Sequence, residues 1–274
     1  MVAVSGGLDS VVLLDILAQK KEYELVVAHV DHGVRDDSVQ DAELVKGLAT
    51  KYGYNIVITR LDISEDTSEN NLRQGRYEFL FDQMKKFGAA AIVTAHHLDD
   101  VLETSIMNIR RGTDRYGAAG GMGREGIIRP LLNVTKQRLL DYAQQKNLQW
   151  REDSTNNDTT YTRNDIRHNV VPVIDRYHYV QHLRRLGEIN HQIDLLLNGR
   201  TSIKEGHIQI SKANLHKMGF REVEVLVAYA LRQARPDIEL SQPRIAQAAR
   251  QIMLGADKIS FSIGAADGII IDIQ

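Results

Sequence analysis

The residues best suited to chemistry stand at the start of the chain, in the string Ser5-Gly6-Gly7-Leu8-Asp9-Ser10. A short apolar run precedes this string, and the apolar spacing after it is that of one helix face. A strand that turns through two glycines into a helix gathers free backbone N–H groups at the positive end of the helix dipole, which favours phosphate binding. Asp9 adds a carboxylate that could hold Mg²⁺ beside the phosphates. A plain Gly-Gly turn with a serine cap is the simpler alternative, and no G-x-x-x-x-G-K-[ST] string occurs in the chain.

A second polar segment follows the apolar run from Leu25 to Val30. It contains His29, Asp31, His32 and Arg35. A solvated loop with a capping aspartate would explain it without any function. The two histidines and the aspartate also have the spacing of metal ligands in metallohydrolases. The third interpretation is nucleotide positioning, with Arg35 directed toward phosphate.

A third polar segment, His96-His97-Leu98-Asp99-Asp100, comes directly after another apolar run, and Glu103 follows it at helical spacing. Asp100 and Glu103 are three residues apart, so one helix face can carry both carboxylates. Acidic residues in a first helical turn often do no more than complement the helix dipole. Several carboxylates beside two histidines favour a site, which could hold Mg²⁺ on a triphosphate or bind a cationic amine through Asp100 and Glu103.

Basic residues form two further groups. Arg73 and Arg76 are one helical turn apart, a pattern that is equally typical of a solvated helix face. The other group is interleaved with Trp150 and Tyr161 and consists of Arg110, Arg111, Arg124, Arg129, Arg151, Arg163, Arg167 and His168. Together with the glycine-rich stretch from Gly112 to Gly126, this group suits a folded RNA, because arginines take phosphates and aromatic rings stack on unpaired bases.

The elements that must position these residues alternate between strand and helix over the first half of the chain. Strands are expected at 2–4, 25–30, 55–61 and 90–95, and helices at 8–18, 39–52, 72–87 and 98–111. This order predicts an α/β fold, a parallel sheet with helices on both faces, in which the three polar segments follow the carboxyl ends of strands. The stretch 112–126 is expected to be a mobile loop without regular structure.

The second half predicts a helix that Thr135 caps and that runs to about Lys146, a long connecting helix, and a small C-terminal α+β domain. That domain has helices near 221–235 and 242–254 and a hairpin of strands at 258–263 and 268–273. The expected domains are 1–178, a connecting helix at 179–198, and 199–274.

Composition narrows the function classes. The 274 residues carry a net charge of −2 and include no cysteine, which excludes disulfides, thiolate zinc sites and cysteine-borne sulfur chemistry. No apolar run reaches 18 residues and no leader precedes the first strand, so neither a membrane span nor a signal peptide is expected. We therefore expect a cytoplasmic protein without membrane partners.

The first string resembles the PP-loop of the ATP pyrophosphatases, and the ordered set of motifs resembles the tRNA(Ile)-lysidine synthetase family. The motifs are Ser5-Gly6-Gly7-Leu8-Asp9-Ser10, Ala28-His29-Val30-Asp31-His32 with Arg35, Arg73-x-x-Arg76-Tyr77, Ala95-His96-His97-x-Asp99-Asp100-x-x-Glu103-Thr104, Arg129-Pro130-Leu131-Leu132, Glu152-Asp153-Ser154-Thr155-Asn156 and Arg163-Asn164-x-Ile166-Arg167. They cover residues 1–175, and the resemblance is weaker beyond. Longer members carry a further C-terminal domain, so either a natural short form or a truncated chain is expected.

The resemblance implies a carbon–nitrogen ligase that uses ATP and Mg²⁺. ATP would adenylate the wobble cytidine of an isoleucine tRNA with a CAU anticodon, and free L-lysine would then displace AMP to give lysidine. Family members often pair, so a homodimer is one expected assembly. The roles implied are ATP binding by Ser5, Gly6, Gly7, Leu8, Asp9, Ser10, His29 and Arg35, metal binding by Asp9, lysine binding by Asp100 and Glu103, catalysis by Asp9, Arg35, Asp100 and Glu103, and tRNA binding by Arg73, Arg76, Arg111, Arg163 and Arg167.

Three other functions stay open at this point. A tRNA thiolase would share the PP-loop, although the lack of cysteine speaks against members that carry sulfur on cysteine or hold an iron–sulfur cluster. A metal-dependent phosphoesterase would use His29, Asp31, His32, His96 and Asp99. A tRNA-binding module with a relic nucleotide site would bind RNA but would not catalyse a reaction.

Overall fold

The computed structural model describes residues 1–20, 22–31, 33, 38–61, 69–120, 126–152, 165–204, 207–235, 241–263 and 267–274. The chain divides into two compact units. The first consists of Met1–Val101 with Glu125–Asn164, and the second of Leu102–Arg124 with Asp165–Gln274. The domain boundaries at 178 and 198 stay a prediction.

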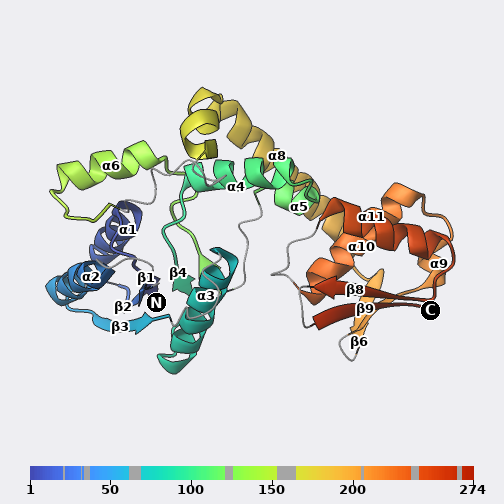
Figure 1. Cartoon of the computed structure of the whole chain (residues 1–274), viewed down its shortest axis with the longest axis horizontal. Helices are drawn as coiled ribbons and strands as arrows, with labels where there is room; N and C mark the ends of the chain where they lie inside the picture. The colour runs from blue at the N-terminus through green and yellow to red at the C-terminus, as the bar shows by residue number, and fades with distance from the viewer. Residues whose placement is uncertain are drawn as a thin grey trace. The chain divides into compact units, whose positions relative to one another are not determined.

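A five-stranded parallel sheet forms the centre of the first unit (Figure 1). Its strands are β1 (Val2–Ala3), β2 (Val26–Asp31), β3 (Asn55–Arg60), β4 (Ile92–Val93) and β5 (Ile127–Ile128). The order is β3-β2-β1-β4-β5, and Val2 pairs with Val27 on one side and with Val93 on the other. The next two strands in the sequence, β2 and β3, lie on one side of β1, and the following two, β4 and β5, lie on the other side. The loop after β1 therefore lies at the topological switch point, where such sheets bind ligands.

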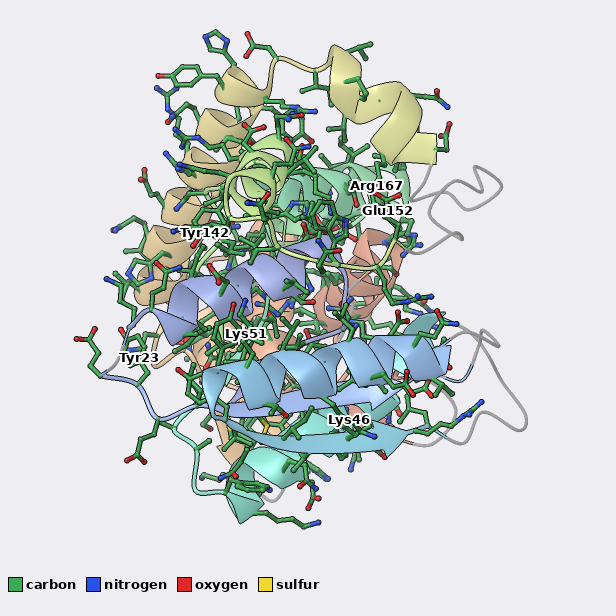
Figure 2. The ribbon with its side chains drawn as sticks, turned by 90° about the vertical axis from the view of Figure 1, so that its left-hand side faces the viewer. Tyr23, Lys46, Lys51, Tyr142, Glu152 and Arg167 are labelled. Atoms are coloured by element: carbon green, nitrogen blue, oxygen red, sulfur yellow. The ribbon has the colours of Figure 1, made fainter. Side chains whose placement is uncertain are left out.

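Alternate residues of the strands enter two separate apolar clusters. Val2 and Val27 belong to one cluster, whereas Ala28 belongs to the other. Successive side chains of a strand point to opposite faces, so the sheet is covered on both sides. The covering helices are α1 (Leu8–Ala18), α2 (Ser38–Tyr52), α3 (Glu69–Lys86) and α6 (Lys136–Gln145). This arrangement confirms the predicted α/β class. Figure 2 shows the side chains of α2, with the exposed Lys46 and Lys51 labelled.

Helix α4 (Leu98–Arg110) begins in the first unit and ends in the second. A short helix, α5 (Arg115–Ala118), follows it, so the prediction that 112–126 has no regular structure was wrong for this part. The reason is local, because Asp114 caps the helix by accepting a hydrogen bond from the Gly117 N–H at 2.9 Å. Residues 121–125 lie outside the described residues.

The second unit joins helices to a four-stranded mixed sheet. A π-helical turn (Ile166–Val170) and a 3₁₀ turn (Val171–Val173) lead into the long helix α8 (Arg176–Leu197). After it come β6 (Thr201–Lys204), β7 (His207–Ile210), α9 (Lys212–Leu215), α10 (Phe220–Ala234), α11 (Gln242–Met253), β8 (Lys258–Ile263) and β9 (Asp267–Ile273). The sheet order is β6-β7-β9-β8, and α10 supplies much of the core. The small C-terminal α+β region and its β8–β9 pairing are confirmed, whereas the β6–β7 pair was not predicted.

Among the described residues, no helix is both long enough and apolar enough to cross a membrane.

Candidate active site

The string Ser5–Ser10 leads from β1 into α1: Ser5, Gly6 and Gly7 lie in the loop, and Leu8, Asp9 and Ser10 are the first three residues of α1. Gly6 has a φ of +94°, a conformation that glycine adopts without the strain that a Cβ would add. The Ser10 hydroxyl accepts a hydrogen bond from the Ser5 N–H at 3.1 Å and donates one to the Gly7 carbonyl at 2.9 Å. Gly7 is the N-cap of α1 and has no side chain to cap it. The loop thus wraps around one hydroxyl and leaves the first turn of α1 without a side-chain cap, an arrangement that suits an anion.

Two residues from elsewhere in the first unit support this loop. The Arg151 N–H donates to the Gly6 carbonyl at 3.0 Å, and its Nε donates to the Asp41 carboxylate at 2.6 Å. A Cβ on Gly6 would lie 3.5 Å from the Cβ of Asp41. Arg151 was predicted among the RNA-binding residues, and its observed contacts instead hold the loop against α2.

His29 has a similar supporting contact. Its side chain is 2% exposed, and its Nδ1 lies 2.8 Å from the carbonyl oxygen of Val4, the residue just before the loop. Within the described residues its Nε2 has no hydrogen-bond partner. His29 therefore fixes the end of β1 from the neighbouring strand, and its predicted role in placing the nucleotide stays a prediction.

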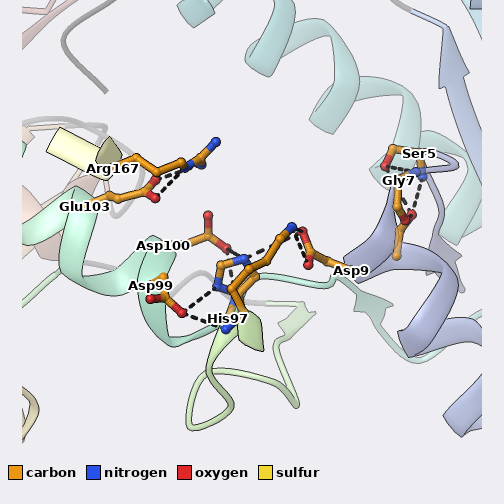
Figure 3. A network of polar contacts seen from close by, with 10 residues as sticks. Ser5, Gly7, Asp9, His97, Asp99, Asp100, Glu103 and Arg167 are labelled. Carbon is orange, nitrogen blue, oxygen red and sulfur yellow. Dashed lines mark hydrogen bonds and ion pairs between the residues drawn. The ribbon is translucent and has the colours of Figure 1, made fainter. Parts of the chain in front are cut away.

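His97 is the centre of the acidic cluster at the start of α4 (Figure 3). It is 4% exposed, and its Nε2 lies 3.6 Å from an Asp9 oxygen and 3.5 Å from an Asp100 oxygen. Its Nδ1 lies 3.8 Å from Asp99. Burial lowers the pKa of His97, but the Asp9 and Asp100 carboxylates outweigh burial and raise this pKa above its ordinary value. The cluster thus stabilises a positive charge on a buried imidazole next to the loop.

Lys136, the first residue of α6, completes this cluster. Its ammonium lies 2.8 and 2.7 Å from the two carboxylate oxygens of Asp9, and its backbone N–H donates to Asp99 at 2.7 Å. Burial raises the pKa of Asp9, but His97 and Lys136 outweigh it and lower this pKa below its ordinary value. The sequence analysis missed Lys136. The only signal was a lysine directly after the predicted cap Thr135, and many surface helices begin in this way.

Glu103 and Arg167 form an ion pair in the second unit. The Glu103 side chain is 1% exposed, and its oxygens accept hydrogen bonds from Arg167 Nε at 2.7 Å and Nη2 at 3.0 Å. The sequence analysis assigned Glu103 to lysine and Arg167 to tRNA. The structure brings these two side chains together, so either role would require the pair to separate.

The arginines of α3 surround Tyr77. This side chain is 2% exposed, and its hydroxyl lies 3.5 Å from Arg129 Nη2. Burial raises the pKa of Tyr77, but the hydrogen bond from Arg129 and the charges of Arg76, Arg129 and Arg73 outweigh burial and lower it. A cluster of positive charge therefore exists on the first unit where Arg73 and Arg76 were predicted to meet RNA. Arg111 is exposed in the second unit.

Several of the predicted residues lie outside the described residues, namely His32, Arg35, Arg124, Tyr161 and Arg163, and the side chain of His168 is not described either. In the part of the chain that the structure describes, no group of three His, Asp or Glu side chains is arranged to hold a metal ion.

A family model and curated relatives both match the first part of this chain. A family model described as a PP-loop domain matches residues 1–174. A protein named tRNA(Ile)-lysidine synthase from Thermosipho africanus is 39% identical over 183 residues, which cover 63% of this chain and 43% of the relative. A protein of the same name from Bacillus cereus is 39% identical over 187 residues, covering 63% of this chain and 39% of the relative. The match thus spans about two fifths of the length of these relatives.

A solved structure resembles the chain in fold. It is the U34-tRNA thiolase NcsA from Methanococcus maripaludis with its [4Fe-4S] cluster, and it superposes with a TM-score of 0.56. The two sequences are 20% identical, and the match covers 68% of this chain and 70% of the thiolase chain. At this identity the likeness concerns the fold alone.

Proposed function

This chain belongs to the PP-loop domain family, and we propose that it catalyses the ATP-dependent formation of lysidine in an isoleucine tRNA. The observation that supports this most is the uncapped, glycine-turned loop after β1, with Asp9 in the first turn of α1, in a segment similar to tRNA(Ile)-lysidine synthases. In the proposed reaction the C2 oxygen of the wobble cytidine attacks the α-phosphorus of ATP and releases pyrophosphate. The amine of free lysine then attacks C2, loses a proton and displaces AMP.

The loop residues Ser5, Gly6, Gly7, Leu8 and Ser10 would hold the phosphates through backbone N–H and hydroxyl groups. Asp9 fits a Mg²⁺ ligand, because its carboxylate is 27% exposed and lies beside this anion site. Mg²⁺ bound there would neutralise the charge that develops on the leaving pyrophosphate. Arg35 and His29 would help to place the nucleotide.

Asp100 and Glu103 would receive the lysine ammonium, since both lie on α4 one turn apart. The Asp100 carboxylate accepts a hydrogen bond from the backbone N–H of His97 at 2.9 Å, which fixes it at the start of α4. Glu103 could bind an amine only after Arg167 leaves it. A nearby carboxylate raises the pKa of an amine, so deprotonation must accompany the attack rather than precede it.

The tRNA would contact Arg73 and Arg76 of the first unit and Arg111, Arg163 and Arg167. Arginine suits this role because its planar group binds phosphate with two hydrogen bonds. The target base must leave its stack before the loop can reach it. The proposal also includes a CAU anticodon and a homodimer, which rest on the sequence resemblance, and a cytoplasmic location, which is the expectation from the composition.

The test uses the purified protein with Mg²⁺, ATP, labelled lysine and an isoleucine tRNA transcript with a CAU anticodon. We expect release of AMP and pyrophosphate that requires the tRNA, and transfer of lysine to the tRNA. A methionine tRNA with the same anticodon is the matched substrate control. If tRNA and lysine together do not stimulate ATP consumption, the proposal is wrong.

One substitution tests the lysine site separately. Asp100→Asn keeps an oxygen for the His97 N–H but removes the charge that would attract an ammonium. We expect tRNA binding within about twofold of the original and a loss of lysine transfer of at least about tenfold. Asp82→Asn, which changes an exposed carboxylate on α3, is the control. Unchanged turnover in the Asp100 variant would contradict the assigned role.

A thiolase is the nearest alternative, and the absence of cysteine speaks against the thiolases that carry sulfur on cysteine or hold an iron–sulfur cluster. Iron–sulfur clusters are held by cysteine thiolates, and the sequence contains none. For a metal-dependent phosphoesterase, metal analysis is decisive, because a tightly bound transition metal would favour it over a ligase that needs Mg²⁺ only with nucleotide.

A further inference from the structure

We propose that Lys136 is a phosphate-binding residue of the loop site, and that its ammonium moves from Asp9 to the β- and γ-phosphates when nucleotide binds. This inference rests on the proposed use of ATP. Lys136 is 127 residues from Asp9 in the sequence, and both of its hydrogen bonds to the Asp9 carboxylate are shorter than 3 Å.

The position of Lys136 is set by three helices that begin close together in the first unit. Asp9 lies in the first turn of α1, and Asp99 and Asp100 lie in the first turn of α4 (Figure 3). Lys136 is the first residue of α6. Hydrogen bonds link these helix starts, because Lys136 binds Asp9 through its side chain and Asp99 through its backbone N–H. The positive ends of three helix dipoles therefore meet around one point.

The three carboxylates at this point have different partners. Asp99 accepts the backbone N–H of Lys136 at 2.7 Å, and Asp100 accepts the backbone N–H of His97 at 2.9 Å, so each of these carboxylates caps a helix start. Asp9 makes the two contacts to the lysine ammonium. Without nucleotide, the Asp9 carboxylate is thus the anion that binds the Lys136 ammonium beside the loop.

Nucleotide binding would change this balance. A carboxylate that coordinates Mg²⁺ cannot at the same time satisfy an ammonium through both oxygens. An ammonium released from Asp9 would remain next to three positive helix ends unless an anion replaced the carboxylate. The β- and γ-phosphates supply that anion, and the Lys136 side chain can turn toward them because it is flexible and 49% exposed.

A purely structural role for Lys136 makes the opposite prediction. If the ammonium only held Asp9 in place, it would compete with Mg²⁺ and nucleotide, and its removal would leave affinity unchanged or raise it. If it transfers to the phosphates, its removal lowers affinity for ligands that carry β- and γ-phosphates and spares those that lack them.

The experiment measures binding to the full chain by calorimetry, with Mg²⁺ and either ATP, pyrophosphate or AMP. For Lys136→Gln we expect ATP and pyrophosphate to bind at least about tenfold more weakly, as for a lost charge-assisted hydrogen bond, and AMP to bind within about twofold. Lys146→Gln, at the exposed C-terminal end of α6, is the matched control and should change none of the three affinities.

A second variant guards against misfolding. Lys136→Arg keeps the charge, so it should restore most of the affinity for ATP, with thermal unfolding measured on each variant. The inference is overturned if the Gln variant binds ATP as well as the original does, or if the Arg variant is as weak as the Gln variant. If the unchanged chain itself binds no ATP, both the proposed function and this inference fail. If the unchanged chain binds ATP and Lys136→Gln binds it equally well, only this inference fails.

Discussion

The Glu103–Arg167 pair gives the sharpest prediction about stability. Arg167→Met keeps most of the aliphatic stem but removes the guanidinium. It would leave the Glu103 carboxylate, which is 1% exposed, without the partner that donates hydrogen bonds at 2.7 and 3.0 Å. A buried charge that loses its partner cannot recover its hydration, so the variant should be strongly destabilised.

The size of the effect follows from burial. Removing one partner of a buried pair typically costs about 3–5 kcal/mol. The Arg167 side chain is 33% exposed, so water can reach the site and the lower end, about 3 kcal/mol, is expected. For a domain of this size each kcal/mol lowers Tm by roughly 2–4 °C, which gives a decrease of about 6–12 °C.

The assay is a double-mutant cycle measured by thermal and urea unfolding. Glu103→Gln alone should cost only about 1 kcal/mol, because the remaining guanidinium can turn toward water. In the Glu103→Gln background, Arg167→Met should then cost less than about 1 kcal/mol, which corresponds to a coupling of about 2 kcal/mol between the two side chains.

The control is Arg110→Met. Its partner Asp165 is 39% exposed and Arg110 itself is 49% exposed, so this variant should lose no more than about 1 kcal/mol. The reasoning is refuted if Arg167→Met costs the same in both backgrounds, because the charge of Glu103 would then not be what Arg167 compensates.

Three further predictions concern other parts of the chain. Tyr52→Phe removes a hydrogen bond to the buried Asp15 carboxylate and should destabilise the first unit by about 1.5–3 kcal/mol in urea unfolding; a loss below about 0.5 kcal/mol would contradict this. Gly117→Ala would bring a Cβ into a clash with the Thr113 side chain, so Thr113 or α5 must shift and Tm should fall; a Tm equal to the original would contradict this. Burial lowers the pKa of His97, but the carboxylates beside it outweigh burial and raise this pKa above 6.5. The charged imidazole therefore stabilises the fold below pH 6.5, and this contribution is lost as pH rises through the pKa of the folded state. A pKa below 6.5 in an NMR titration would refute the predicted direction of the shift.

Much of the fold and the phosphate loop could be predicted from the sequence, because both depend on local patterns. Apolar runs separated by helix-spaced stretches specify strands that alternate with helices, and this order alone favours a parallel sheet. The glycines at 6 and 7 specify the turn into α1, since a positive φ at Gly6 requires no other part of the chain. The strands β6 (Thr201–Lys204) and β7 (His207–Ile210) were missed because each has only four residues. The alternation of polar and apolar residues in β7 is the strand period, but four positions are the shortest run that carries this signal.

The partners of the site residues were decided only by the tertiary structure. Lys136 reaches Asp9 across 127 residues, and Arg167 reaches Glu103 across 64. Nothing near Lys136 in the sequence distinguishes it from an ordinary surface lysine at a helix start. The motif that contains Arg167 drew attention to this arginine but gave no indication that its partner is Glu103. What selects them is that helices from distant parts of the chain begin beside the same loop or pack together, and packing distances are a property of the whole fold rather than of any segment.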